Sequence, residues 1–487
     1  MVSSEIDIEA QKQNNKKMMP VLVIGTFLGF LNQTLMNVAL PKIMQTFSIT
    51  ASQGQWLSNG YMLVNGVMVP LTAFLIQRFS TRQLYLSAMS IFAAGTIIGG
   101  IAPSYSVLIF GRMIQAAGAG IIAPLMNVSI MDMYPLHERG KAMGWVGLAL
   151  NFAPAMGPTL SGYLVQNLSW RYLFFLVAPL IILDIIFAAK VLRNLTEAQK
   201  LPLNWGGVLL SSVGLGSLLL GFSNAGDYGV ASMHVIGYVI IGLAIVSVFV
   251  YQQIHSKVKL LNFNVFKYHN FNVSVTINIF LMMAQYGGML LLPLYMQNIR
   301  GYSAMISGLA LLPGALVTAV MSPISGNLYD RYGAKYMSMI GTGILFVGTI
   351  MLSRVSMSSA FAWVALSQAV RQLGLSLVIM PIQTEALNSL PPQIIPDGSA
   401  MYTTIRQVAG SFGTAVLIGI MSIIQKNKIA ALAIHHSMHF AKENGALQAT
   451  QHTYLIAAAC VIVSCLLTLR FKTLNCQVKC NTNGLFL

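Results

Sequence analysis

Charged residues are scarce in this sequence, and acidic residues are the scarcest. Asp, Glu, Lys and Arg together make up 8% of its 487 residues, whereas a soluble domain carries about 25%. Hydrophobic residues make up 56% of the chain, and the mean hydropathy is +0.70. This composition excludes a water-soluble globular protein and predicts a chain that packs against lipid as well as against itself.

The shortage of acids leaves a formal net charge of +16. A basic excess of this size can indicate nucleic-acid binding when the charges form blocks. Here the basic residues are dispersed in short connectors between apolar runs. We therefore expect no nucleic-acid partner.

Cysteine and histidine are few, and neither is placed for a metal site. The cysteines lie near or after the last apolar run and predict no disulfide framework; they are Cys460, Cys465, Cys476 and Cys480. Cys476 and Cys480 are expected to be reduced thiols of a tail. His435 and His439 belong to a polar outer connector, where we expect solvated side chains. No metal and no cofactor are predicted.

Several motifs are also absent. Without a phosphate-binding P-loop, an ATP-driven pump is not expected. Neither paired acids nor a His-x-x-x-His pattern occurs at membrane depth, so a membrane-embedded enzyme is the least favoured class. The first residues are polar and acidic rather than signal-like, so the first apolar run is expected to be an uncleaved anchor.

The sequence does contain about fourteen apolar runs, and a helix needs about 20 such residues to cross a bilayer. They cover roughly 19–41, 55–76, 84–103, 106–130, 142–165, 172–189, 205–223, 234–253, 271–297, 304–325, 336–356, 360–385, 398–423 and 453–470. With the N-terminus inside, eighteen Lys and Arg fall in inside segments and seven in outside segments, which is the usual bias. The predicted fold is an all-α integral membrane protein with both termini cytoplasmic.

Two connectors resemble each other and indicate an internal repeat. "FLIQRFSTRQLYL" (74–86) follows the second run, and "GNLYDRYGAKYM" (326–337) follows the tenth. Each is followed, 35–40 residues later, by an arginine inside a run, Arg112 or Arg371. Parallel repeats of this kind are typical of transporters that rock two halves about a central site. The predicted parts are a tail (1–18), a six-helix half (19–190), two inserted helices (191–254), a second six-helix half (255–470) and a tail (471–487).

Several motifs together resemble the major facilitator superfamily, and within it the fourteen-helix drug:proton antiporter branch. They are "NQTLMNVALP", "RMIQAAGAG", "APAMGPTLSG", "WRYLFF" and the loop signature "GNLYDRYGAK". The resemblance implies a proton-coupled multidrug efflux transporter of the plasma membrane, working as a monomer. It would export amphipathic, often cationic compounds by alternating access. An uptake transporter or an uncoupled facilitator of a polar metabolite remains the alternative.

The chain departs from that branch at two places. The first-helix motif usually carries an acid where this chain has Asn32. The first loop signature is eroded, because Ala73, Gln77 and Ser80 replace the expected Gly, Asp and Gly. The second copy of the loop signature is intact here. These departures put the usual coupling acid in doubt but not the fold.

Polar residues inside the runs are the candidates for a substrate cavity, since buried amides and charges need partners. They are Asn32, Gln33, Asn37, Arg112, Gln115, Gln285 and Arg371. Gln33 and Asn37 share one helix face, while Asn32 points about 100° away. One face would meet the substrate and the other a neighbouring helix. Bonding between helices alone, or an arginine that snorkels to the interface, is the alternative.

Two acids in the runs, Glu385 and Asp184, are the candidates for proton coupling. Glu385 ranks first because its run also carries Arg371, the counterpart of Arg112. Asp184 is six residues from Lys190, and it belongs to a helix that is usually peripheral in the family.

Two further segments are candidates for a conformational gate. In the loop signature, Asp330 could accept backbone N–H groups at a helix start or pair with the nearby basic residues; the gate residues are Asp330, Arg331, Gly333 and Lys335. In "ALNFAPAMGPTLSG", small residues recur every fourth position and predict a close helix seam between the two halves; its gate residues are Gly157 and Pro158. A basic inside loop and ordinary kinked packing are the alternatives.

Overall fold

The computed structural model describes residues 2–195, 202, 204–229, 232–256, 258–434 and 437–472, and these residues form helices and connectors without a strand. Thirteen α-helices follow in order: α1 (Val2–Phe47), α2 (Ala51–Arg78), α3 (Thr81–Gly100), α4 (Tyr105–Met133), α5 (Arg139–Asn167), α6 (Tyr172–Val191), α7 (Trp205–Tyr228), α8 (Met233–His255), α9 (His269–Leu294), α10 (Ala304–Ser353), α11 (Phe361–Asn388), α12 (Ile395–Leu432) and α13 (Met438–Thr468). Three short helices lie between them: η1 (Phe263–Lys267), η2 (Tyr295–Ile299) and η3 (Pro392–Ile394).

The predicted runs all fall on helices, and α10 carries two of them. Within α10, Gly333 has a φ of 77° and breaks the helical path between 304–325 and 336–356. By length and composition, eleven helices of the described chain can cross a membrane, with α10 counted once. The all-α membrane class is therefore confirmed, while the number of crossings stays a prediction.

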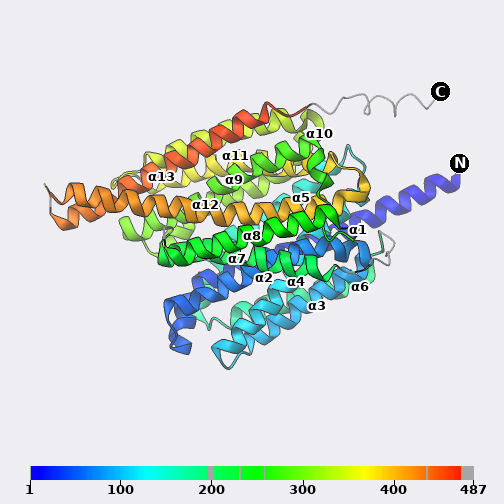
Figure 1. Cartoon of the computed structure of the whole chain (residues 1–487), viewed down its shortest axis with the longest axis horizontal. Coiled ribbons are helices and arrows are strands. Elements are labelled where there is room, and N and C mark those ends of the chain that lie inside the picture. The colour runs from blue at the N-terminus through cyan, green and yellow to red at the C-terminus, as the bar shows by residue number, and fades with distance from the viewer. Residues whose placement is uncertain are drawn as a thin grey trace.

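Helices extend beyond the predicted apolar runs at two places. α1 begins at Val2, inside the predicted tail 1–18. The chain between the last two predicted runs is largely formed by extensions of α12 and α13, which project beyond the other helices (Figure 1). Hydropathy marks where a chain meets lipid, and residues such as Ala, Lys and Gln continue a helix into water. His435, Cys476 and Cys480 lie outside the described residues.

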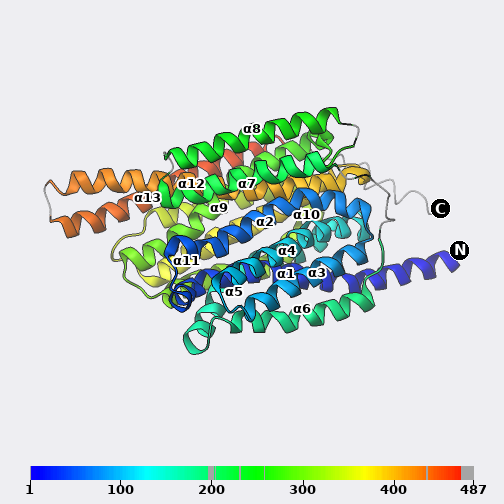
Figure 2. The ribbon, with the colours of Figure 1, turned by 60° about the horizontal axis from the view of Figure 1, so that its bottom comes forward.

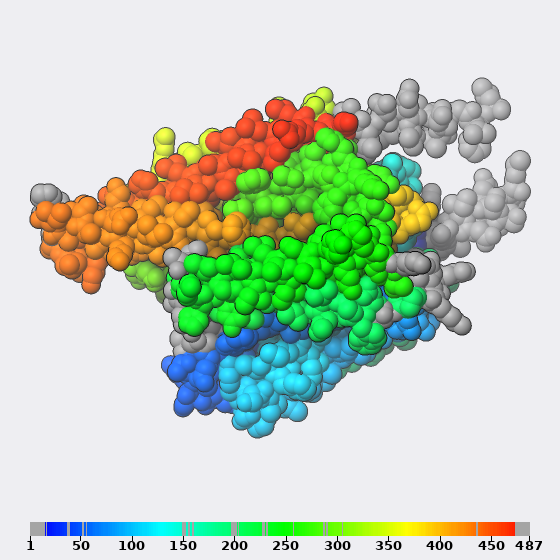
Figure 3. All heavy atoms as spheres, in the orientation of Figure 1, coloured from blue at the N-terminus to red at the C-terminus, as the bar shows by residue number. Residues whose placement is uncertain are grey.

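The helices form two groups with α7 and α8 across them. In Figure 1, α2, α3, α4 and α6 lie below, α9–α13 lie above, and α7 and α8 cover the front between them; Figures 2 and 3 show the same cover from another side and as surfaces. α7 contacts both α2 and α12, so the inserted helices bridge the two groups. The start of α1 and the end of α13 lie at the same end of the bundle.

Glycines bring helices into close contact beside both buried arginines. A Cβ on Gly95 of α3 would lie 2.6 Å from the carbonyl oxygen of Gly111 on α4, next to Arg112. A Cβ on Gly348 of α10 would lie 2.6 Å from the Cα of Arg371 on α11. Small residues of this kind let helix backbones approach in membranes. The matching contacts agree with the internal repeat.

Candidate functional site

Arg112 is the centre of a buried polar cluster on α4. Its side chain is 1% exposed. Nη1 donates to the Asn32 Oδ1 and, over 2.6 Å, to the Gln115 Oε1, while Nε donates to the Leu57 carbonyl over 3.4 Å. The guanidinium lies 4.2 Å from the centroid of the Tyr61 ring. All these partners are formally neutral, and Nη2 is buried with no partner among the described residues.

The amides of the first helix face two ways, as their spacing predicts. Gln33 lines a small cavity, and Asn32 instead contacts Arg112 of α4. Asn32, Arg112 and Gln115 do not line this small cavity, because their polar atoms are bonded to one another, and their part in substrate binding stays a prediction. The side chain of Asn37 lies outside the described part of the chain. Asn32 is best described as a residue that positions Arg112.

The cavity itself lies where α1, α2 and α4 meet α12. Its volume is ≈ 20 Å³, which is room for about one water. Its polar lining comes from Thr26, Gln33, Asn65, Thr403 and Gln407, and its apolar lining includes Phe30. Gln407 Nε2 donates to Asn65 Oδ1 over 2.7 Å and joins α12 to α2 across it. The helices of the two groups are therefore closed around this point.

Arg371 forms a separate site in the second group of helices. It is 1% exposed, and its Nη2 donates to the Ala284 carbonyl of α9 over 2.8 Å. A Cβ on Gly288 would lie 2.8 Å from its guanidinium carbon, so the glycine leaves room for it. Neither Arg371 nor the half-buried Gln285 lines the small cavity, and their predicted role in substrate binding stays a prediction. Arg371 lies between α9, α10 and α11.

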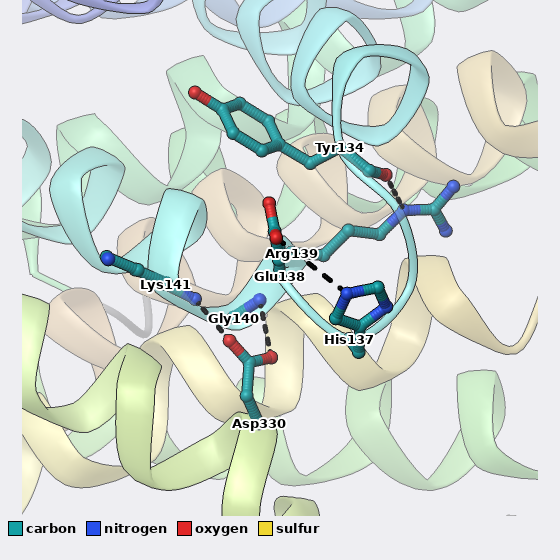
Figure 4. Close-up of polar contacts among 7 residues, drawn as sticks. All are labelled: Tyr134, His137, Glu138, Arg139, Gly140, Lys141 and Asp330. Atoms are coloured by element: carbon teal, nitrogen blue, oxygen red, sulfur yellow. Dashed lines mark hydrogen bonds and ion pairs between the residues drawn. The ribbon is translucent and has the colours of Figure 1, made fainter. Parts of the chain in front are cut away.

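The intact loop signature closes one end of the bundle. Asp330 Oδ1 accepts the Gly140 N–H over 2.9 Å, and Oδ2 accepts the Lys141 N–H over 2.8 Å (Figure 4). These two N–H groups open α5, where a helix carries partial positive charge and unsatisfied donors. Of the two predicted roles for Asp330, the contact with backbone N–H groups is formed. Here it joins α10 to α5.

A glycine seam lies behind this carboxylate. A Cβ on Gly326 of α10 would lie 2.9 Å from the Gly140 carbonyl carbon, and a Cβ on Gly144 would lie 2.7 Å from the Ser322 carbonyl oxygen. The loop signature suggests a turn at Gly326, which instead permits this close approach. Gly333 does form the turn, with its positive φ. We call the Asp330 contact and this seam the inner latch; Arg331 and Lys335 lie at its rim, exposed and half-buried respectively.

The small-residue stripe of α5 does not lie at this seam. A Cβ on Gly157 would lie 2.8 Å from the Thr34 Cβ of α1, and Ser161 Oγ donates to the Leu35 carbonyl over 2.7 Å. The sequence predicts that this stripe forms the seam between the two halves. The stripe instead packs on α1, which belongs to the same group of helices as α5. Spacing identifies a close face but not the helix that covers it. The side chain of Pro158 lies outside the described part.

We expect Gly157→Val to force α5 away from α1. Overpacking of this kind costs about 1–3 kcal/mol, so the variant should melt at a lower temperature and lose transport while still inserting. Gly162→Val is the matched control, because nothing lies within 4 Å of its Cβ position on the same helix. Native transport and melting in Gly157→Val, at equal expression, would contradict the expected clash.

Glu385 lies next to the inner latch, near the end of α11. It is 6% exposed. Its Oε1 accepts Asn270 Nδ2 over 2.7 Å, and its Oε2 accepts the Tyr329 hydroxyl over 2.9 Å. Tyr329 in turn accepts Asn388 Nδ2 over 3.1 Å, and Asn388 Oδ1 accepts Arg139 Nη1 over 3.0 Å. A continuous hydrogen-bond chain therefore links this buried acid to the first residue of α5.

Asp184 lies away from both the cavity and the latch. It is 4% exposed on α6, and its Oδ2 accepts the Tyr85 hydroxyl of α3 over 2.7 Å. The same hydroxyl lies 2.9 Å from the Val21 carbonyl of α1. Because one hydroxyl hydrogen faces two acceptors, protonating Asp184 would release it to Val21. The geometry suits a proton-dependent contact between α1, α3 and α6.

Sequence reasoning missed Asp397, in the first turn of α12. It is 4% exposed, accepts the Asn262 N–H over 3.0 Å, and is hydrogen-bonded by the Gln77 side chain. Gln77 occupies the position where the first loop signature expects an acid. At this contact between α2 and α12, the acid therefore lies at the start of α12, whereas the loop signature expects it at position 77. An acid directly after Pro396 was the available signal, since both favour a helix N-terminus.

Comparison with known proteins bears on this architecture. A family model described as Major Facilitator Superfamily matches residues 22–414. The uncharacterized MFS-type transporter YcnB of Bacillus subtilis is 40% identical over 465 residues, which cover 96% of this chain and 97% of that protein. The lincomycin resistance protein LmrB of Listeria monocytogenes is 35% identical over 424 residues, covering 86% and 90% respectively.

A solved structure supports the fold independently. The crystal structure of the human organic anion transporter MFSD10 (TETRAN) aligns with a TM-score of 0.65 at 12% sequence identity. The alignment covers 93% of this chain and 99% of that chain. At this identity the likeness concerns the fold alone.

Proposed function

The chain belongs to the major facilitator superfamily, whose members are transporters rather than enzymes, and from this premise we propose that it exports amphipathic compounds in exchange for protons. It is a multi-pass protein of the cytoplasmic membrane. We propose fourteen crossings with both termini cytoplasmic, which places the inner latch at the cytoplasmic face. The one observation that carries the proposal is this closed latch with the buried Glu385 joined to it.

Export would proceed by alternating access between α1–α6 and α9–α13. The latch and the bridge from Gln407 to Asn65 both join these two groups. Opening the latch exposes the cavity region to the cytoplasm, and closing it allows release on the other side. The resistance named for the LmrB relative supports drug-like compounds as substrates of this chain.

The driving force would be the proton gradient. One charge crossing 100 mV is worth about 2.3 kcal/mol, which sustains a roughly fiftyfold concentration ratio. We assign the coupling proton to Glu385, with Asp184 as the second candidate. Ionised Glu385 accepts two hydrogen bonds, and protonation would remove one acceptor and weaken the chain to Arg139. Proton binding would thereby change the stability of the closed latch.

Export in everted membrane vesicles tests this function. With an acid lumen, vesicles containing the chain should accumulate amphipathic dyes, and collapse of the pH gradient should release them. Vesicles without the chain are the control. Accumulation that is insensitive to the gradient would favour uncoupled facilitation, the alternative that the sequence left open.

The amide at position 32 allows a separate prediction. Asn32→Ala removes an acceptor from the buried Arg112, and a hydrogen bond to a charged group is worth about 1.5–3 kcal/mol. We therefore expect a lower melting temperature in detergent, whereas Gln33→Ala, one residue along, should melt like the native chain. Asn32→Asp places a titratable group beside the guanidinium and should alter the pH profile of export. Native melting in Asn32→Ala would contradict this role.

A further inference from the structure

The middle of this helix bundle carries positive charge without acids to balance it. Three arginines lie well inside helices that can cross the membrane: Arg112, Arg371 and Arg406. The sequence has only twelve acidic residues. Most of the acids that the structure describes in such helices lie toward helix ends. They are Asp132, Glu385, Asp397, Glu443 in the second turn of α13, Asp184 about two turns before the end of α6 and, at the turn within α10, Asp330. The side chain of Asp227, near the end of α7, lies outside the described part.

Arg406 lies beside the cavity. It is half-buried on α12, and its guanidinium carbon lies 5.9 Å from the centroid of the Phe30 ring, which lines the cavity. Its neighbours along α12, Thr403 and Gln407, also line the cavity. The hydroxyl of Tyr402, one turn before Arg406, is buried without a partner in the described structure.

The remaining lining supplies hydrogen bonds but no negative charge. Thr26, Gln33 and Asn65 contribute hydroxyl and amide groups from the other side of the cavity. Among the residues that the structure describes, the partners of Arg112 behind this wall are amide and carbonyl oxygens and an aromatic face. Taking a charge out of water is costly unless a partner of opposite charge offsets it. A bound group with negative charge would offset that cost, and a permanent cation would add to it.

We propose that the compounds exported by this chain carry an anionic group such as a carboxylate, and that Arg406 binds this group at the cavity between α1, α2, α4 and α12. The proposal deepens the proposed export function and rests on it for the direction of transport. It replaces the expectation of cationic substrates, which came from the family resemblance and not from these residues. Arginine suits the role because its planar fork matches a carboxylate with two parallel hydrogen bonds.

Equilibrium binding to the purified full chain in detergent tests this inference without any gradient. Rhodamine B carries a free carboxylate, and its ethyl ester is the same dye with that charge removed. We expect the acid to bind at least roughly tenfold more tightly than the ester, which corresponds to about 1.4 kcal/mol. Arg406→Gln should remove the difference, and Arg406→Lys should retain part of it.

Arg354→Gln is the matched control, since Arg354 is exposed at the end of α10 and should leave the difference unchanged. Native elution on size exclusion shows that each variant is folded. Equal or tighter binding of the ester, no binding of the acid, or a difference that survives Arg406→Gln overturns the inference. Failure of proton-driven export with the binding difference intact would instead count against the proposed function alone.

Discussion

Glu385→Gln is expected to abolish pH-driven export while preserving substrate binding. The amide keeps the size of the side chain and one acceptor for Asn270 or Tyr329, but it cannot gain or lose a proton. Without a titrating group beside the latch, substrate movement loses its link to the gradient. The measurement is dye accumulation in everted vesicles across a range of imposed pH gradients, together with dye binding at equilibrium.

Two controls separate coupling from folding in that experiment. Glu443→Gln removes a half-buried acid of α13 that lies far along the chain from the latch and pairs with His439, and it should leave export unchanged. Asp184→Asn removes the second candidate and should reduce export less than Glu385→Gln. If both Glu385→Gln and Asp184→Asn keep full pH-driven export, neither acid carries the proton.

Asp330→Asn is expected to shift the chain toward states open to the cytoplasm. An amide has one oxygen and no charge, so it cannot accept both the Gly140 and Lys141 N–H groups as the carboxylate does. A carboxylate at a partly buried helix start is worth about 1–2 kcal/mol, so the ratio of closed to open latch should fall roughly fivefold to thirtyfold. Thiol labelling of single cysteines on each side of the seam, in a background without the native cysteines, measures this ratio.

Glu138→Gln is the control for the latch. Glu138 immediately precedes α5 but makes no side-chain cap with it, and Figure 4 shows it pointing away from Asp330. Its removal should leave the labelling pattern as in the native chain. Labelling of Asp330→Asn that matches the native chain on both sides, with native export, would reduce Asp330 to a residue of an inside loop.

The sequence predicted the parts of this fold that hydropathy and local chemistry determine. Apolar runs of sufficient length must become helices in lipid, because backbone groups there have no other partner. A Gly-rich turn with an acid likewise predicted a helix-capping role for Asp330, which the structure forms with α5. Both predictions used residues close together in the chain, whereas the helix that Asp330 caps, α5, lies far from it in sequence.

The parts that sequence reasoning missed depend on which distant helix covers each face. The stripe through Gly157 packs on α1, and the seam to α10 uses Gly140 and Gly144 instead. The spacing of Asn32 and Gln33 predicts that they face two ways, but only the structure shows which face meets Arg112. Helix periodicity gives a direction around the axis, whereas the neighbour in that direction follows from the packing of the whole bundle.

Sequence reasoning also missed the charge of the residues around the cavity. Family resemblance alone suggested cationic substrates, although the sequence already showed an amide at position 32 and few acids. The structure adds that Arg406 lies beside Phe30 at the cavity and that the acids gather toward the helix ends. The sequence could have indicated this charge, because the acids leave the middle of the apolar runs with arginines and amides but little negative charge.

Substrate-evoked proton movement tests the central claim, exchange of substrate for protons, most directly. The purified chain is reconstituted into liposomes that contain a pH-sensitive dye, and substrate is added outside without an imposed gradient. We predict that substrate entry makes the lumen more alkaline as protons leave, and that Glu385→Gln removes this response while still binding substrate. Substrate accumulation in the native chain with no change in lumenal pH would contradict proton exchange.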